Sequence, residues 1–450
     1  MFAYLPQSDE EIRRMLADIG VDSIDDLFSD IPVDLRLKKP LDLQKAKAEY
    51  EVQQRLSALA QANKVRTLFA GAGQYDHIIP AAVNYLAGRA EFVTAYTPYQ
   101  PELSQGILQA LFEFQSCIAE ITGLPVSNAS LYDGFTAAAE ACVMALNSRR
   151  NSHVLLIAGT VHPYTLMVLH SFFGDLDVDI HIMAEAGGRV ELSALKRMIK
   201  EHGENLACVL VQTPNIYGAL ENLTGWADAV HEAGGRLIIS AHPLSLGHLA
   251  SPKDWGADIA VGDTQSLGLP PYFGGPSAGY IACEEDLMRR MPGRIVGESV
   301  DADGKRCFVL TLQAREQHIK RERATSNICS NQALAAVANT VYLALLGAKG
   351  FAEVSRLNIN GSETLRLKLC RELGLSEYGG GPYFNEFTLE IPVERRRWDA
   401  VFEKHDFVSG VWLSDLNESF PKNLLAVAVT EKRSREELDR YTEYAAEALR

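Results

Sequence analysis

Buried strands and amphipathic helices alternate through the middle of the chain. In residues 191–203 the apolar side chains recur with the helical period and share one face, and residues 225–235 repeat this arrangement. Between such helices lie short, continuous apolar runs of the kind found in strands that are buried on both faces. These runs are 153–159, 179–185, 206–212, 236–241, 258–263 and 279–283. The alternation predicts a doubly wound α/β sheet that is mostly parallel.

The two ends of the chain show other patterns. Residues 1–65 hold two helical patterns with acidic, loop-like breaks and no strand pattern, which predicts a helical N-terminal arm. A long helix rich in alanine and leucine is expected over 332–346, followed by strand patterns between helices. We therefore predict three parts: the arm at 1–65, a large α/β domain at 66–325 and a small α+β domain at 326–450.

Composition narrows the class of protein. With 450 residues, 47% hydrophobic and 22% charged, the chain resembles a globular enzyme. Its net charge of −15 argues against nucleic acid or an anionic membrane as the main partner. We expect no membrane span and no secretory signal. Seven scattered cysteines, never spaced CxxC, favour reduced thiols in the cytoplasm over disulfides or a metal site.

The loop at residues 262–278 raises a chemical question. Loops that follow a sheet strand often hold the reacting group of an α/β enzyme. This loop contains no lysine, cysteine, histidine or arginine, and Asp263 is its only charged residue. The sequence thus predicts a site from which the reacting group is missing.

Four positions in chain order indicate which chemistry is missing. Enzymes of the PLP-dependent aminotransferase-like fold (type I) need a helix start for the phosphate, a stacking ring, an aspartate for the ring nitrogen and a lysine for the Schiff base. The corresponding positions here hold Gly134, His162, Ser240 and Ser266. Ser240 cannot carry the negative charge and Ser266 cannot form an imine, while Asp133 places a carboxylate where phosphate would bind. The set predicts a vestigial cofactor site.

Each of these residues also has a plainer interpretation. Asp133 is equally suited to cap the helix that follows it. His162, which precedes a proline, could be a core or cap histidine. The two serines carry no meaning singly, so the hypothesis depends on the ordered set.

Longer stretches resemble one family over nearly the whole chain. Residues 91–124, with TPYQPE and SQG, and residues 312–336 closely resemble the glycine cleavage system P-protein, the decarboxylating glycine dehydrogenase. Residues 71–80, 128–141 and 214–223 resemble the same family. The length and the missing lysine are similar to the first subunit of its two-gene form, in which a second, homologous chain carries the PLP lysine. Only His162 has no cofactor role that the family supplies.

The resemblance implies a function for an assembly. Such an enzyme condenses glycine with PLP, releases CO2 and passes the aminomethyl group to the lipoyl arm of the H-protein. It implies an α2β2 assembly in which this chain is the catalytically incomplete half and the partner subunit binds PLP.

Enzymes of this fold build each active site at a dimer interface, and the segment TAYTPYQ is the candidate to reach the partner's pocket. The phenol hydroxyls of its tyrosines can donate to a phosphate or a carboxylate, and its prolines stiffen the loop. The alternative is that the tyrosines only pack in the interface. The candidate residues are Tyr96, Thr97, Pro98, Tyr99 and Gln100.

A basic cluster stands out in this acidic chain. It could attract an acidic carrier protein or position the carboxylate of glycine across the interface. A solvated surface helix explains the same charges equally well. The cluster consists of Arg315, His318, Lys320, Arg321 and Arg323.

Two rival functions remain open. The chain could be an interaction or regulatory protein that kept the fold and lost catalysis. It could also be a self-sufficient PLP lyase that uses Lys253, although Lys253 precedes the strand at 258–263 and would emerge from its wrong end.

Overall fold

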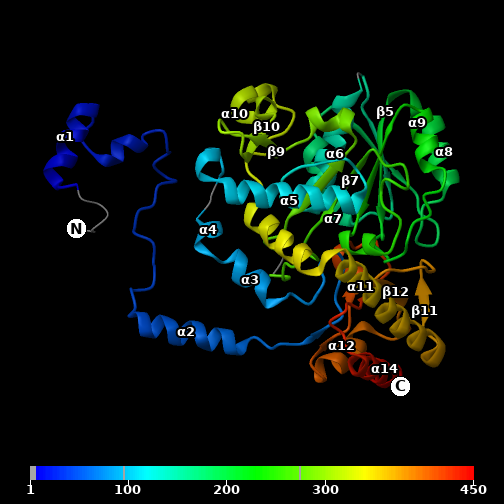
Figure 1. Ribbon diagram of the computed structural model, residues 1–450. Helices are drawn as coiled ribbons and strands as arrows, with labels where there is room; N and C mark the ends of the chain where they lie inside the picture. The colour runs from blue at the N-terminus through cyan, green and yellow to red at the C-terminus, as the bar shows by residue number, and fades with distance from the viewer. Residues whose placement is uncertain (1–6, 95–96, 150, 273–274) are drawn as a thin grey trace. The chain divides into compact units, whose positions relative to one another are not determined.

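The computed structural model describes residues 7–94, 97–149, 151–272 and 275–450 (Figure 1). The chain divides into two compact units, Met1–Lys64 and Val65–Arg450. Each unit is described by itself below.

The first unit is helical and has no core of its own. It contains α1 (Asp9–Ile19), the 3₁₀ helix η1 (Ile24–Phe28) and α2 (Glu49–Ala62). Helix α1 begins at a capping box formed by Ser8 and Glu11. Of residues 7–64, which the structure describes, none is buried. Large apolar side chains are exposed along the unit, among them Leu27, Phe28, Ile31, Val33, Leu35, Leu37, Leu41, Leu43, Leu56 and Leu59.

The second unit is built on a seven-stranded sheet in the order β2-β8-β7-β6-β5-β3-β4. Strands β4, β3, β5, β6 and β7 are parallel to one another, and β8 runs antiparallel to both β7 and β2. All six apolar runs of the sequence form strands, which confirms the predicted α/β sheet. The strands are β2 (Val126–Ser127), β3 (Val154–Ala158), β4 (Asp179–Met183), β5 (Leu206–Thr213), β6 (Arg236–Ala241), β7 (Ile259–Asp263) and β8 (Gly279–Cys283).

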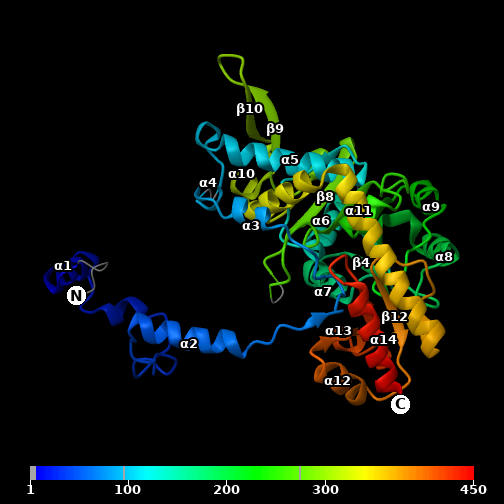
Figure 2. The ribbon, with the colours of Figure 1, turned by 60° about the horizontal axis from the view of Figure 1, so that its bottom comes forward.

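Helices cover the sheet on two faces, each with its own apolar core. One core packs α6 (Gly134–Ser148), α7 (Pro163–Phe173), α8 (Leu192–His202) and α9 (Trp226–Glu232) against the strands. The other packs α3 (Ala81–Ala87), α5 (Gln105–Thr122) and α11 (Ala333–Leu373). Figure 2 shows α5 and α11 lying together, away from α8 and α9.

Helix α11 is longer than the sequence pattern indicated. It kinks at Gly347, whose φ is 57°, and continues to Leu373. By length and composition alone it would suffice to cross a membrane, a test that the core helix of a protein also passes. Two of its polar side chains bond to other elements: Asn339 donates to the carbonyl oxygen of Leu267 at 2.7 Å, and Thr340 donates to that of Ala110 on α5 at 3.2 Å. We therefore interpret α11 as a core helix.

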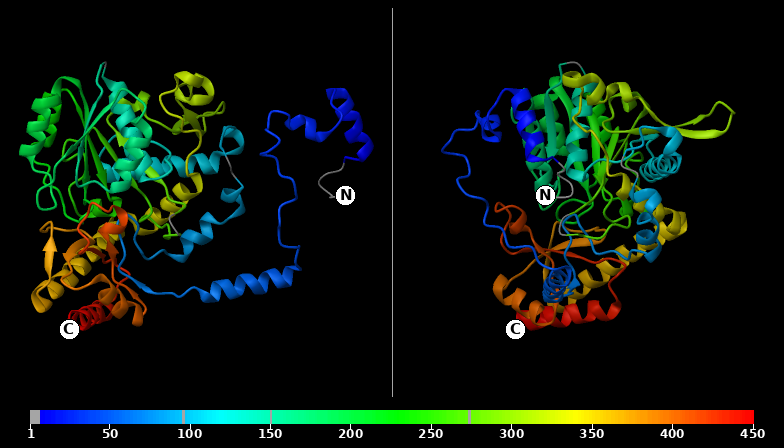
Figure 3. Two further views of the ribbon diagram at one scale, coloured as in Figure 1. Left: turned by 180° about the vertical axis from the view of Figure 1, so that it is seen from behind. Right: turned by 90° about the vertical axis from the view of Figure 1, so that its left-hand side faces the viewer.

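A four-stranded antiparallel sheet follows α11 in the order β11-β12-β15-β14. Its strands are β11 (Ser376–Tyr378), β12 (Glu386–Glu390), β14 (Val411–Trp412) and β15 (Leu424–Ala428). Helices α12 (Arg395–Lys404) and α14 (Arg435–Leu449) pack against it (Figure 3). Strand β1 (Thr67–Leu68) pairs in parallel with β13 (Phe407–Val408), so an early segment of this unit joins its C-terminal part. The predicted domain boundaries near residues 65 and 325 stay a prediction.

A hairpin precedes the three short helical turns that carry the basic cluster. Strands β9 (Ile295–Val300) and β10 (Arg306–Thr311) form the hairpin, which projects beyond α5 in Figure 2. The chain then passes through η6 (Gln313–Arg315), α10 (Gln317–Lys320) and η7 (Arg321–Arg323). The cluster therefore lies on turns rather than on one surface helix.

Candidate functional site

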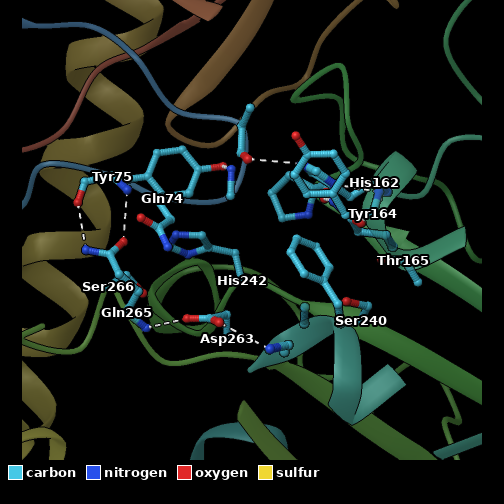
Figure 4. Close-up of a pocket in the computed structure, with 18 of the residues that line it drawn as sticks. Gln74, Tyr75, His162, Tyr164, Thr165, Ser240, His242, Asp263, Gln265 and Ser266 are labelled. Atoms are coloured by element: carbon cyan, nitrogen blue, oxygen red, sulfur yellow. Dashed lines mark hydrogen bonds between the residues drawn. The ribbon is translucent and has the colours of Figure 1, made fainter. Parts of the chain in front are cut away.

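A cavity of about 350 Å³ opens at the carboxyl ends of β3, β5, β6 and β7. It is the place where open α/β sheets bind their ligands. Gly134, His162, Ser240 and Ser266, the four positions singled out in the sequence, all line it (Figure 4). The structure thus brings together residues that are more than 130 positions apart in the chain.

The start of α6 at this cavity is already bonded to carboxylates. Asp133 is the N-cap, and its side chain accepts from the backbone N–H of Thr136 at 2.8 Å. The backbone N–H of Gly134 donates to Oδ2 of Asp263 at 3.1 Å. A Cβ at Gly134 would come within 2.9 Å of the backbone nitrogen of Asp263, so only glycine allows this approach. The N–H groups of Gly134 and Thr136 are therefore occupied, and two carboxylates stand beside them.

Asp263, the only charge in the loop, holds that loop in place. Besides Gly134, it accepts from the backbone N–H of Gln265 at 2.8 Å and from the hydroxyl of Ser277. Burial raises the pKa of Asp263 to about 6, although the donors around it act in the opposite direction. Sequence analysis noted this residue without giving it a role.

His162 caps α7 and is neutral. Its Nδ1 accepts from the backbone N–H of Tyr164 at 3.1 Å, and its Nε2 donates to the carbonyl oxygen of Ala72 at 3.1 Å. Burial lowers the pKa of His162 to about 4. The centroid of its ring lies 4.9 Å from those of Phe135 and Tyr164, two aromatic residues that sequence analysis missed. The structure therefore shows the cap interpretation of His162, on the wall of the cavity.

The two serines leave the cavity without a reacting group. Ser240 lies near the end of β6, and Ser266 is buried with its hydroxyl lacking a hydrogen-bond partner. Next to Ser240, His242 is held neutral because burial lowers its pKa to about 3. Among the described residues that line the cavity, none is a lysine or an arginine.

The far wall of the cavity is fixed by the C-terminal sheet. The hydroxyl of Tyr75 donates to Oε2 of Glu386 at 3.0 Å, and the backbone N–H of Ala72 donates to its Oε1 at 2.7 Å. Gln265 bonds the backbone of Tyr75 at both N–H and C=O, at 2.9 and 3.0 Å. Burial raises the pKa of Glu386 to about 7. No local pattern could have found this set, because its members lie far apart in the chain.

Tyr99 and the basic cluster lie side by side at a second place. The side chain of Tyr99 is 51% exposed, and its ring stands edge-on to that of His318, with centroids 6.1 Å apart. The guanidinium of Arg294 lies 5.3 Å from the centroid of the Tyr99 ring. Arg294 is buried and was not singled out in the sequence. These contacts hold one side of the Tyr99 ring and leave the other side exposed.

The other candidates of this region have mixed environments. Pro98 is buried, Thr97 is partly buried and Gln100 is exposed, while Tyr96 lies outside the described residues. Arg321 and Arg323 are exposed, whereas Arg315 donates to the carbonyl oxygen of Gly293 at 2.6 Å. Burial lowers the pKa of Arg315. Lys253 is remote from this chemistry, since it forms an ion pair with Glu284 on the surface.

Comparison with known proteins agrees with this architecture. The family model described as "Glycine cleavage system P-protein" matches residues 2–444. The chain belongs to the glycine cleavage system P-protein family. A relative from Carboxydothermus hydrogenoformans, named "Probable glycine dehydrogenase (decarboxylating) subunit 1", is 45% identical over 443 residues and 98% of each chain. A relative of the same name from Geobacillus kaustophilus is 45% identical over 97% of each chain.

Solved structures agree with the family and the fold. A crystal structure described as glycine decarboxylase (P-protein) of the glycine cleavage system, in inhibitor-bound form, is 41% identical with a TM-score of 0.85, covering 99% of this chain and 100% of that one. An alanine–glyoxylate aminotransferase from Nostoc sp. has a TM-score of 0.60 at 17% identity, covering 86% of this chain and 96% of that one. At this low identity the second likeness shows only the fold. The predicted type I fold of PLP-dependent enzymes is confirmed.

The cavity of this P-protein chain does not fit PLP. Position 266 holds a serine where an imine requires an amine, and position 240 holds a serine where the ring nitrogen requires a carboxylate. The N–H groups at the start of α6 are bonded to Asp133 and Asp263, which also oppose a phosphate dianion. Three of the requirements of the cofactor are unmet in one cavity.

Proposed function

We propose that this chain is the non-PLP-binding subunit of a glycine decarboxylase. In this proposal a homologous second subunit binds PLP, which supplies the electron sink for the loss of CO2 from glycine. The assembly is α2β2, and it passes the aminomethyl group to the lipoyl arm of the H-protein. The observation that carries the proposal is the cavity of a PLP fold with a serine at both position 240 and position 266, and with no lysine among its described lining residues, in a member of the P-protein family.

The apolar surface of residues 7–64 supports a subunit partner. Leu35, Leu37 and Leu43 are 72, 75 and 75% exposed, and no residue of this unit that the structure describes is buried. Large apolar side chains exposed in such number along one segment fit a surface that another chain covers. Its relatives are named as a subunit 1, which implies a subunit 2.

The segment around Tyr99 supports a role at the partner's active site. Arg294 and His318 hold the ring of Tyr99 from within this chain, so that its exposed part is oriented before any partner binds. We propose that Tyr99 donates a hydrogen bond to an anionic group in the partner's pocket, and that Thr97, Pro98, Gln100 and Tyr96 shape the same contact. The exposed Arg321 and Arg323, with Arg315 beside them, add positive charge at this surface.

We place the assembly in the cytoplasm. All seven cysteines are free, and two of them, Cys142 and Cys208, approach to 3.9 Å between sulfur atoms without a bond. Reduced thiols at this distance fit a reducing compartment.

Co-expression with a homologous chain that contains the PLP lysine tests the proposal. We expect the purified pair to exchange labelled CO2 into glycine, and each chain alone to be inactive. If the pair assembles but is inactive while the partner alone is active, this chain is an interaction or regulatory protein instead. Exchange by this chain alone would contradict the proposal outright.

A further inference from the structure

We propose that the cavity of this chain is itself a binding site for an uncharged aromatic ring compound that carries no phosphate. The residues that exclude PLP have not filled the cavity: about 350 Å³ remains open between the strand ends and the loop at residues 72–75. That volume lies in the range of small-molecule sites and accommodates one ring with short substituents. The proposal rests on the proposed function, in which PLP is held by the partner subunit and not in this cavity.

Aromatic side chains form one wall of the cavity. The rings of Phe135, His162 and Tyr164 lie within 5.9 Å of one another, centroid to centroid, and all three line the space. Tyr75 and His242 contribute rings on the other side, 5.0 Å apart and close to perpendicular (Figure 4). A planar aromatic ligand gains both buried area and favourable ring contacts in such a space.

The charges around the cavity select against anions. Asp133 and Asp263 stand at the start of α6, and no described lining residue is a lysine or an arginine to balance them. Both lining histidines are neutral, because burial lowers their pKa values to about 4 and about 3. A phosphate or carboxylate at the start of α6 would therefore meet repulsion, and the N–H groups of Gly134 and Thr136 are already bonded there.

The carboxylate of Asp263 keeps its negative charge but offers a cation little room for direct contact. The oxygens of Asp263 already accept from Gly134, Gln265 and Ser277, so they are committed to holding the loop. An uncharged ligand remains as the class that the cavity accommodates.

Polar groups at the cavity indicate how a neutral ring would be recognised. The hydroxyl of Ser240 can donate to an uncharged ring nitrogen, whereas a carboxylate there would require a protonated one. Ser266 lines the same cavity and is buried.

A matched pair of probes tests the site. Pyridoxine and pyridoxine 5′-phosphate differ only in the phosphate, and each is titrated into the assembled protein by ligand-observed saturation-transfer NMR. Borohydride reduction beforehand keeps the partner's cofactor in place. We expect pyridoxine to bind. The phosphate ester should bind at least about tenfold more weakly, because its charge meets the carboxylates of Asp133 and Asp263 at the start of α6.

Variants of residues in this chain test whether the NMR signal of bound pyridoxine comes from this cavity. Ser240→Leu fills the space and should abolish pyridoxine binding, whereas Ser240→Ala keeps the space and should weaken it only several-fold. Phe135→Ala removes part of the aromatic wall and should also weaken it, which covers the case that Ser240→Leu does not assemble. Asp133→Asn retains the helix cap, removes one charge and should strengthen binding of the phosphate ester.

Three results would overturn the proposal. They are the absence of pyridoxine binding to the wild-type assembly, equal binding of the two probes, and binding that survives both Ser240→Leu and Phe135→Ala.

Discussion

Four polar residues decide the chemistry of the cavity. Ser240 and Ser266 lack the charge and the amine that PLP requires, and Asp133 and Asp263 occupy the backbone donors at the start of α6. Asp133 is at once a helix cap and a barrier to phosphate, so the two interpretations open at the level of sequence are compatible. The departures from what PLP requires are therefore spread over several side chains.

The first prediction follows from that distribution. Ser266→Lys supplies the amine alone, and we expect no PLP adduct at position 266 because Ser240 and the two aspartates are unchanged. Incubation with PLP, borohydride reduction and mass spectrometry of the purified chain give the measurement. A stoichiometric adduct at position 266 would show that the cavity still fits the cofactor.

The second prediction concerns Tyr99. Tyr99→Phe keeps the ring that Arg294 and His318 contact and removes only the hydroxyl. A hydrogen bond to a charged group is worth roughly 1.5–3 kcal/mol, so glycine–CO2 exchange by the assembled pair should fall about ten- to hundred-fold with assembly intact. Tyr85→Phe, an exposed change on α3, is the control. If the Tyr99→Phe pair exchanges CO2 at the wild-type rate, the hydroxyl of Tyr99 has no role in the reaction and the ring only packs in the interface.

At the scale of elements, the loop at residues 71–77 connects the seven-stranded and the four-stranded sheets of the second unit. Glu386 on β12 bonds Tyr75 and Ala72, and Gln265 after β7 bonds Tyr75 from the other side. The position of the cavity wall thus depends on both sheets. A buried carboxyl at this junction makes its stability depend on pH.

The third prediction gives the sign of that dependence. The pKa of Glu386 is raised from 4.5 to about 7 in the folded chain, so the folded state holds the proton more tightly than the unfolded state. Its contribution to stability therefore declines as pH rises from about 4.5 through about 7. Glu386→Gln cannot ionise at this position. As the pH rises from about 5 to about 8, wild type should therefore lose about 2–3 kcal/mol of its free energy of unfolding relative to Glu386→Gln.

Urea unfolding of both proteins at the two pH values gives the measurement. Glu390→Gln, an exposed change on the same strand, is the control and should follow wild type. A constant difference between Glu386→Gln and wild type across this range would contradict a raised pKa for Glu386.

The elements were more predictable than the contacts between them. Strands such as β3 and β5 are continuous apolar runs because both faces are buried, and that pattern is local. The four cavity positions could be placed because His162 and Ser266 follow strands, Ser240 lies near the end of β6 and Gly134 begins α6. Glu386 and Arg294 could not, since their roles depend on residues that lie hundreds of positions away. The extension of α11 past Gly347 was missed because glycine commonly ends a helix.

At the scale of the whole molecule, two features indicate that the chain is one subunit of an assembly. Residues 7–64 expose their apolar side chains, and the cavity of the second unit lacks the groups for PLP. If this chain and the proposed second subunit form an obligate pair, we expect their interface to bury more than about 2,000 Å².

The fourth prediction tests the exposed leucines. The double change Leu35→Ser and Leu37→Ser should leave the unfolding of this chain unchanged, because both side chains are more than 70% exposed. It should weaken association with the second subunit by at least about tenfold, since each leucine buried at an interface contributes about 1.5–3 kcal/mol. Leu176→Ser, on the second unit and 59% exposed, is the control. Sedimentation of the mixed subunits measures the change, and an unchanged affinity would remove these leucines from the interface.

The most direct test of the account is to locate PLP in the assembled enzyme. The purified pair is reduced with borohydride, the two chains are separated, and peptides from each are analysed by mass spectrometry. We expect every cofactor label on one lysine of the partner subunit and none on this chain. A stoichiometric label on any lysine of this chain, Lys253 included, would contradict the assignment of this chain as the subunit that does not bind PLP.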